Sequence, residues 1–157
     1  MDRREWMMAG RFYEDWTVGD RIAHEIRRTV TETDNLLFST MTHNPQPLHL
    51  DVEAAKAGEF GRILVNGTFT FALMVGLSVG DTTLGVLVAN LGYDKLVMPH
   101  PVFIGDTMRA STEVAELRES RSRPAAGLVT FRHELHNQRD EIVCQCLRTA
   151  LVRRRPA

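Results

Sequence analysis

Residues 66–79 have the sequence NGTFTFALMVGLSV, which is the most hydrophobic stretch of the chain. Asn66 and Gly67 open this stretch, and the residues that follow place apolar side chains around nearly the whole circumference of a helix. A helix that is apolar on all sides belongs in a protein core. The sequence therefore predicts a central helix over residues 68–79 that the rest of the chain buries.

Strand-like segments flank this helix in the sequence. Apolar and polar residues alternate loosely over residues 21–31, and similar patterns cover residues 84–97, 107–114, 128–136 and 141–152. Short polar connections between neighbouring segments predict an antiparallel sheet, and one face of that sheet must be covered by the apolar helix. We therefore expect a single α+β domain in which an antiparallel sheet wraps around a long central helix.

The segment between the first strand and the central helix is predicted to hold two short helices and a loop. Residues 31–34 form a capping sequence, so a short helix should follow them. The prolines within residues 44–47 disfavour a helix, which predicts an extended loop that delivers His49. Asp51 should then cap a brief helix over residues 52–57.

Composition and charge exclude several classes of protein. The chain has 157 residues with 19 Lys and Arg against 20 Asp and Glu, so it has no excess of positive charge for a nucleic-acid partner. No window approaches the ~20 apolar residues that span a bilayer, so we expect no membrane partner.

We expect a cytoplasmic protein in which Cys144 and Cys146 are reduced core residues. We divide it into an N-terminal tail, residues 1–10, and one domain, residues 11–153.

Three motifs carry a resemblance to a known family. They are NPQPLHLD at residues 44–51, FGRILVN at residues 60–66 and GDTTLG at residues 80–85. The chain resembles the MaoC-like hydratases of the hotdog superfamily, which include the R-specific enoyl-CoA hydratases, and among them the mesaconyl-CoA hydratase subgroup. The resemblance implies a hotdog fold, an acyl-CoA substrate, no metal or organic cofactor, and a homodimer or higher homo-oligomer with the active site near the subunit interface.

The chain departs from the hydratase motif at two positions. Asn44 stands where the family usually has its catalytic Asp, and Gln46 stands where Asn is expected. An amide can hold a water molecule but cannot exchange a proton at useful pH. Three interpretations stay open: His49 handles both proton transfers while Asn44 positions water, the site is inactive, or another carboxylate supplies the acid. The candidates for that carboxylate are Asp34, Glu59 and Asp81.

The chemistry of hydration assigns roles to the motif residues. Adding water to an α,β-unsaturated thioester requires a base, a proton source for the α-carbon, and donors for the enolate oxygen. His49 is the predicted base because imidazole titrates near neutral pH. The amide of Gly67 is the predicted oxyanion donor, since it lies at a helix N-terminus. The alternatives are a structural histidine at His49 and a simple tight turn at Gly67.

Three further residues are candidates for substrate binding. Asn66 either caps the central helix or orients the substrate, and Gln46 is assigned to the substrate site. Arg62 offers a bidentate partner for the free carboxylate of a dicarboxylic acyl-CoA, although a solvated loop arginine is the alternative.

The predicted function is the reversible addition of water to an α,β-unsaturated acyl-CoA, branched or dicarboxylic, such as mesaconyl-CoA. The rival functions are an acyl-CoA thioesterase of the hotdog type and a non-catalytic acyl-CoA-binding protein.

Overall fold

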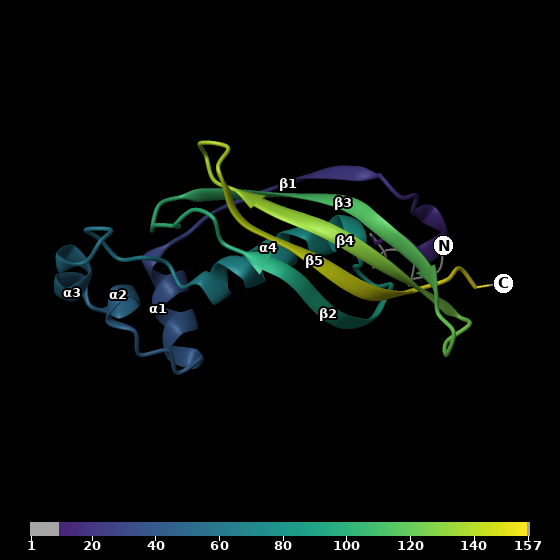
Figure 1. Ribbon diagram of the computed structural model, residues 1–157, viewed down its shortest axis with the longest axis horizontal. Helices are drawn as coiled ribbons and strands as arrows, with labels where there is room; N and C mark the ends of the chain where they lie inside the picture. Colours follow the sequence, from purple (N-terminus) through teal and green to yellow (C-terminus); the bar gives the residue numbers. More distant parts are fainter. Residues whose placement is uncertain (1–9, 157) are drawn as a thin grey trace, which may run out of the picture.

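The computed structural model describes residues 10–156. An antiparallel sheet of five strands in the order β1-β3-β4-β5-β2 forms its main layer. The strands are β1 (Arg21–Thr29), β2 (Leu87–Val97), β3 (Thr107–Glu119), β4 (Ala126–His136) and β5 (Ile142–Arg153). Helix α4 (Gly67–Thr82) runs along one face of this sheet (Figure 1) and contacts β1, β3, β4 and β5. The predicted α+β arrangement is confirmed.

Short helices gather at one end of the sheet, next to the start of α4. They are α1 (Glu32–Met41), α2 (Pro47–Leu50) and α3 (Val52–Ala57), and Figure 1 shows them together at the left. A 3₁₀ turn, η2 (Tyr13–Asp15), precedes β1. Residues 1–9 of the predicted tail lie outside the described residues. The amide of Gly10, the last residue of that tail, donates to the carbonyl of Leu84 (3.0 Å).

The predicted helix caps are confirmed, and the predicted loop is one residue shorter than expected. Thr31 accepts from the amide of Asp34 at the start of α1, and Asp51 accepts from two amides at the start of α3. The loop expected over residues 44–47 is confirmed at residues 44–46, but Pro47 opens the short helix α2 and His49 lies within that helix. Proline is compatible with the first turn of a helix, where its missing N–H would have no partner.

The core lies between α4 and the sheet, and it covers one side of the helix. Met74 and Leu77 of α4 are buried among residues of the sheet and its connections. The expectation that the helix is buried all round is wrong for the single chain, since Ala72 and Gly76 on its other side are exposed. Hydrophobicity around a helix does not say which of its sides the same chain covers.

The two cysteines belong to this core. Cys144 and Cys146 lie on β5 as free, buried thiols, which confirms their predicted state. Burial raises the pKa of Cys144 to about 12 and the pKa of Cys146 to about 11. Both side chains therefore stay protonated near neutral pH, and they act as apolar filler.

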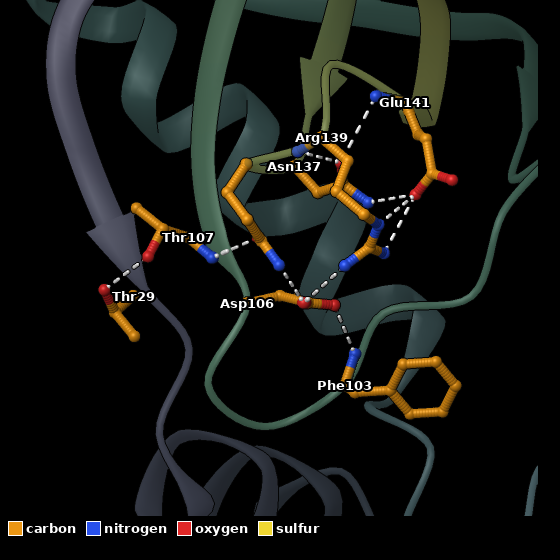
Figure 2. A network of polar contacts seen from close by, with 8 residues as sticks. Thr29, Phe103, Asp106, Thr107, Asn137, Arg139 and Glu141 are labelled. Atoms are coloured by element: carbon orange, nitrogen blue, oxygen red, sulfur yellow. Dashed lines mark hydrogen bonds and ion pairs between the residues drawn. The ribbon is translucent and has the colours of Figure 1, made fainter.

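A polar network ties together the two turns that border the predicted site. Asp106, buried at the end of the β2–β3 connection, accepts from the amide of Phe103 (2.9 Å) and from Gln138 (2.7 Å). Its carboxylate also faces Arg139 (3.6 Å), which pairs with Glu141 (2.8 Å), as Figure 2 shows. The network fixes the connection after β2 against the β4–β5 turn, so the position of one turn depends on the other.

A second polar chain crosses the core under the C-terminal end of α4. Asp81 bonds Nδ1 of His24 (2.7 Å), and Nε2 of His24 bonds the hydroxyl of Thr112 (2.7 Å). That hydroxyl also bonds Nδ1 of His133 (2.8 Å), which is fully buried on β4. Desolvation, followed by the charges of Arg148 and His24, lowers the pKa of His133 to about 3. The histidine is therefore neutral in the folded protein.

We expect His133 to make the protein less stable in mild acid. Its pKa is about 3 when folded and about 6.5 when unfolded, so the unfolded chain binds the extra proton and the free energy of unfolding falls from pH 6.5 toward pH 3. Between pH 7 and pH 5 the loss from this group is about 2 kcal/mol. Urea denaturation at both pH values measures it. His133→Gln, which does not titrate, should show a smaller decrease, whereas equal decreases would contradict the assignment.

Candidate active site

Helix α2 holds the imidazole of His49 in a defined orientation. Nδ1 of His49 lies 2.7 Å from the carbonyl oxygen of Leu64. A carbonyl oxygen can only accept, so Nδ1 carries the proton and Nε2 of the neutral ring carries a lone pair. This tautomer suits a general base, because the nitrogen that can take a proton is the one left unbound.

The N-terminus of α4 supplies a free backbone amide, that of Gly67. The side chain of Asn66 caps the helix by accepting from the amide of Thr68 (2.9 Å). Within residues 10–156, the amide of Gly67 donates to no backbone or side-chain acceptor. This N–H lies at the positive end of the helix dipole, so it can donate to an oxygen that gains negative charge.

Asn35 of α1 ties these two segments together. Its side-chain amide donates to the carbonyl of His49 (2.8 Å), and its oxygen accepts from the amide of Asn66 (2.9 Å). Asn35 is buried, and Ser39 one turn later bonds the side chain of Asn66 (3.2 Å). The sequence analysis did not identify Asn35. The signal that could have indicated it is the spacing of Asn35 and Ser39, two polar residues four positions apart and therefore on the same face of a helix.

We expect Asn35→Ala to destabilise the protein by about 2 to 4 kcal/mol, because it leaves a buried amide and a carbonyl without partners. Urea denaturation measures this loss. Thr33→Ala is the matched control, since Thr33 is exposed on the same helix and its change should stay within about 0.5 kcal/mol. A variant as stable as this control would show that Asn35 does not hold the two segments.

A cavity of about 340 Å³ opens beside Gly67. Apart from Gly67, its lining is mostly apolar and comes from the turn before α4, from α4, from the connection after β2 and from β5: Phe60, Leu64, Val65, Thr70, Met98, Pro99, His100, Pro101, Val102 and Val143. A side chain at position 67 would meet the sulfur of Met98 at 2.6 Å. The glycine therefore keeps the wall of the cavity open at the start of the helix. Leu64, whose carbonyl oxygen bonds Nδ1 of His49, is one of these lining residues.

The two amide residues of the motif shape the turn before α2. The side chain of Asn44 accepts from the amide of Gln46 (3.2 Å), and the carbonyl of Gln46 accepts from the amide of His49 (3.0 Å). Asn44 is half-buried, and the side chain of Gln46 is exposed. Their direct roles in binding water or substrate stay predictions.

The two remaining candidates for substrate binding, Asn66 and Arg62, have different surroundings. Asn66 is 2% exposed, so the cap is the role that the structure shows for its side chain. The guanidinium of Arg62 stacks on Phe103, 3.6 Å from the ring centre. Phe103 in turn packs edge-on against Phe60 of the cavity wall (6.1 Å between ring centres). The ring of Phe103 thus lies between Arg62 and the cavity-lining residue Phe60.

The carboxylates proposed as a substitute acid have other partners. Asp34 caps α1; desolvation raises its pKa, but hydrogen bonds from Thr31 and the charge of Arg28 leave that pKa below its ordinary value. Asp81 lies at the opposite end of α4 and bonds His24. Glu59 is exposed and does not line the cavity. The structure therefore favours none of the three as the missing acid.

Within residues 10–156, no group of three or more His, Cys, Asp or Glu side chains is placed to hold a metal ion. No helix in this part of the chain is long and apolar enough to cross a membrane.

Comparison with known proteins identifies the family. The profile of the MaoC like domain matches residues 15–135. The chain belongs to the MaoC-like domain family. This MaoC-like chain is 37% identical over 147 residues to the mesaconyl-CoA hydratase of Cereibacter sphaeroides, covering 94% of the chain and 42% of that relative. It is 30% identical to the beta-methylmalyl-CoA dehydratase of Chloroflexus aurantiacus, covering 93% and 41%. The chain therefore spans less than half the length of these relatives.

Solved structures support the same family and its fold. The monoamine oxidase regulatory protein of an Archaeoglobus species matches with a TM-score of 0.83 and 34% identity, over 94% of this chain and 97% of that one. A double hotdog protein of Mycobacterium tuberculosis matches with a TM-score of 0.85 over 94% of this chain and 46% of its own. Its 23% identity shows the fold alone. The MaoC-like domain is a hotdog fold, as predicted.

Proposed function

We propose that this MaoC-like domain adds water reversibly to the double bond of an α,β-unsaturated acyl-CoA, as a hydratase or dehydratase of the carbon–oxygen lyase class. The observation that carries the proposal is the link through Asn35, which joins a histidine with a free Nε2 to the helix start that presents the Gly67 amide. The relatives named as a hydratase and a dehydratase support it.

The geometry suggests how the reaction runs. Nε2 of His49 takes a proton from a water molecule as the water oxygen attacks the β-carbon. The π electrons move toward the α-carbon and the thioester oxygen, to which the amide of Gly67 donates. Asn44 holds the water or the substrate. We propose that no metal or organic cofactor takes part and that the acyl-CoA is the substrate.

For the acyl group we propose a branched or dicarboxylic chain such as that of mesaconyl-CoA. Support comes from the 37% identity to a mesaconyl-CoA hydratase and from the place of Arg62, which stacks on Phe103 next to the cavity-lining residue Phe60. A guanidinium can bind a second carboxylate bidentately. Arg62→Gln should then raise KM for mesaconyl-CoA more than KM for crotonyl-CoA.

Incubation of the purified protein with crotonyl-CoA, mesaconyl-CoA and a saturated acyl-CoA tests the function. We expect loss of the enoyl absorbance without release of free thiol. Thiol release from the saturated substrate would instead identify a thioesterase. Stabilisation by acyl-CoA without any turnover would identify a non-catalytic binder. This outcome is tested because the amide of Asn44 cannot exchange a proton.

We propose that a second copy of the chain pairs along the edge strand β2. This strand has a sheet partner on one side only, and it exposes large apolar side chains: Val88, Leu91, Tyr93, Leu96 and Val97. An unpaired apolar edge is an aggregation hazard unless another chain covers it. The exposed side of α4 at Ala72 and Gly76 also lacks cover within residues 10–156.

We expect light scattering coupled to size exclusion to give a mass of about twice 17.8 kDa. Leu91→Lys combined with Leu96→Lys should shift that mass toward the monomer, because each chain would bring two charges into the interface. Val18→Lys, at another exposed apolar residue, should leave the mass unchanged. A monomeric parent protein would contradict the proposal.

A further inference from the structure

The proposed reaction lacks one component, a group that gives a proton to the α-carbon. Asn44 stands where the family usually has a carboxylate, and its amide cannot act as an acid. The missing group must reach the same cavity as the amide of Gly67. Among the residues that line this cavity, His100 has the only titratable side chain.

His100 is anchored in the same way as His49. Its Nδ1 lies 2.9 Å from the carbonyl oxygen of Ile142, at the start of β5. The carbonyl can only accept, so Nδ1 is the donor and Nε2 is the nitrogen left for chemistry. His100 lines the cavity, and His49 is bonded to Leu64, another residue of its lining. In each imidazole Nδ1 is bound to a backbone carbonyl, and Nε2 has no hydrogen-bond partner within residues 10–156.

A carboxylate lies next to the residue that anchors His100. Glu141 precedes its anchor Ile142, and the pKa of Glu141 is lowered by hydrogen bonds to Asn137 and Arg139 and, to a smaller degree, by the charge of His100. Glu141 belongs to the network of Figure 2, in which Asp106 and Arg139 tie the turn after β4 to the connection that carries His100. The network thus ties the connection that carries His100 to the turn that precedes its anchor, Ile142.

We propose that His100 is the second proton-transfer residue of the site and supplies the proton that Asn44 cannot; the inference rests on the proposed hydratase function. In hydration, His49 takes one proton from water while the oxygen forms a bond to the β-carbon. The electron pair of the double bond then takes the proton on Nε2 of His100 at the α-carbon. His49 returns its proton to solvent and His100 regains one, so the net change is addition of H and OH.

The test uses the full chain and two substitutions of His100. His100→Asn keeps a side-chain donor for the carbonyl of Ile142 but has nothing in the place of Nε2. His100→Gln keeps the length of the side chain without an acid. We expect kcat for enoyl-CoA hydration to fall about 10²- to 10⁴-fold in both variants, with KM and melting temperature close to those of the parent. His43→Asn is the matched control, since His43 is exposed and has a left-handed backbone (φ 53°) that Asn tolerates.

A second measurement separates acid catalysis from positioning. Adding Asn44→Asp to His100→Asn should raise kcat at least about tenfold above that of His100→Asn alone, because it returns a carboxyl group to the site. If neither this change nor added imidazole restores kcat, His100 is not the acid and the inference is overturned. A parent protein that hydrates enoyl-CoA and variants with unchanged kcat would overturn the inference and leave the function standing. A parent protein without hydratase activity would overturn the function itself.

Discussion

His49→Ala should lower kcat/KM for enoyl-CoA hydration by about 10²- to 10⁴-fold and leave the fold intact. The substitution removes the nitrogen that takes the proton from water, and this is the usual range for loss of a general base. The structural loss is one hydrogen bond to the carbonyl of Leu64, which is worth about 1 kcal/mol. Steady-state kinetics and urea denaturation of the same preparation measure the two effects.

A companion variant distinguishes chemistry from local structure. His49→Asn places a side-chain amide where Nδ1 donates to Leu64, so the turn keeps its hydrogen bond while the base is lost. We expect this variant to be as inactive as His49→Ala and nearly as stable as the parent. Full activity in His49→Asn would show that the residue only supports the turn.

Gly67→Ala is expected to lower kcat by about 10²- to 10³-fold, the usual effect of losing one oxyanion donor. The added carbon would lie 2.6 Å from the sulfur of Met98, so the Met98 side chain must move within the cavity where the thioester should lie. The same carbon hinders approach of the carbonyl oxygen to the amide. Hydration kinetics with crotonyl-CoA measure the effect.

Gly67→Ala should lower activity without lowering stability. Alanine favours helix over glycine by about 0.5 to 1 kcal/mol, and Met98 is flexible and 42% exposed, so the melting temperature should stay equal or rise. Gly80→Ala is the matched control in the same helix, because nothing lies within 4 Å of the added carbon. Equal activity in both variants would contradict the role of the Gly67 amide.

Local patterns in the sequence were sufficient for most of the architecture. The apolar run after Gly67 predicted α4, and alternation predicted the strands, since both signals depend on neighbours within a few residues. Their ends were less accurate. β3 continues to Glu119 beyond the expected residue 114, and β2 begins at Leu87 because the amide of Val86 bonds the carbonyl of Thr83 (3.2 Å) in a turn after the helix.

The candidate site divides in the same way. His49 and Gly67 stand in motifs that can be recognised without a structure. Asn35 and His100 could not be assigned in this way, because their significance depends on partners far along the chain. Asn35 reaches Asn66 across 31 positions, and His100 reaches Ile142 across 42. Nothing within a few residues of either one indicates that partner.

The sequence alone determined the family, the α+β hotdog class and the motif residues, because periodicity, helix caps and short motifs are set by residues close together in the chain. Tertiary structure decided which tautomer His49 adopts, which amide is left without a partner, which side of α4 the chain covers and which histidine shares the cavity with Gly67. These features arise where distant segments meet, and the hydrogen bonds and burial made there are not encoded in any single segment.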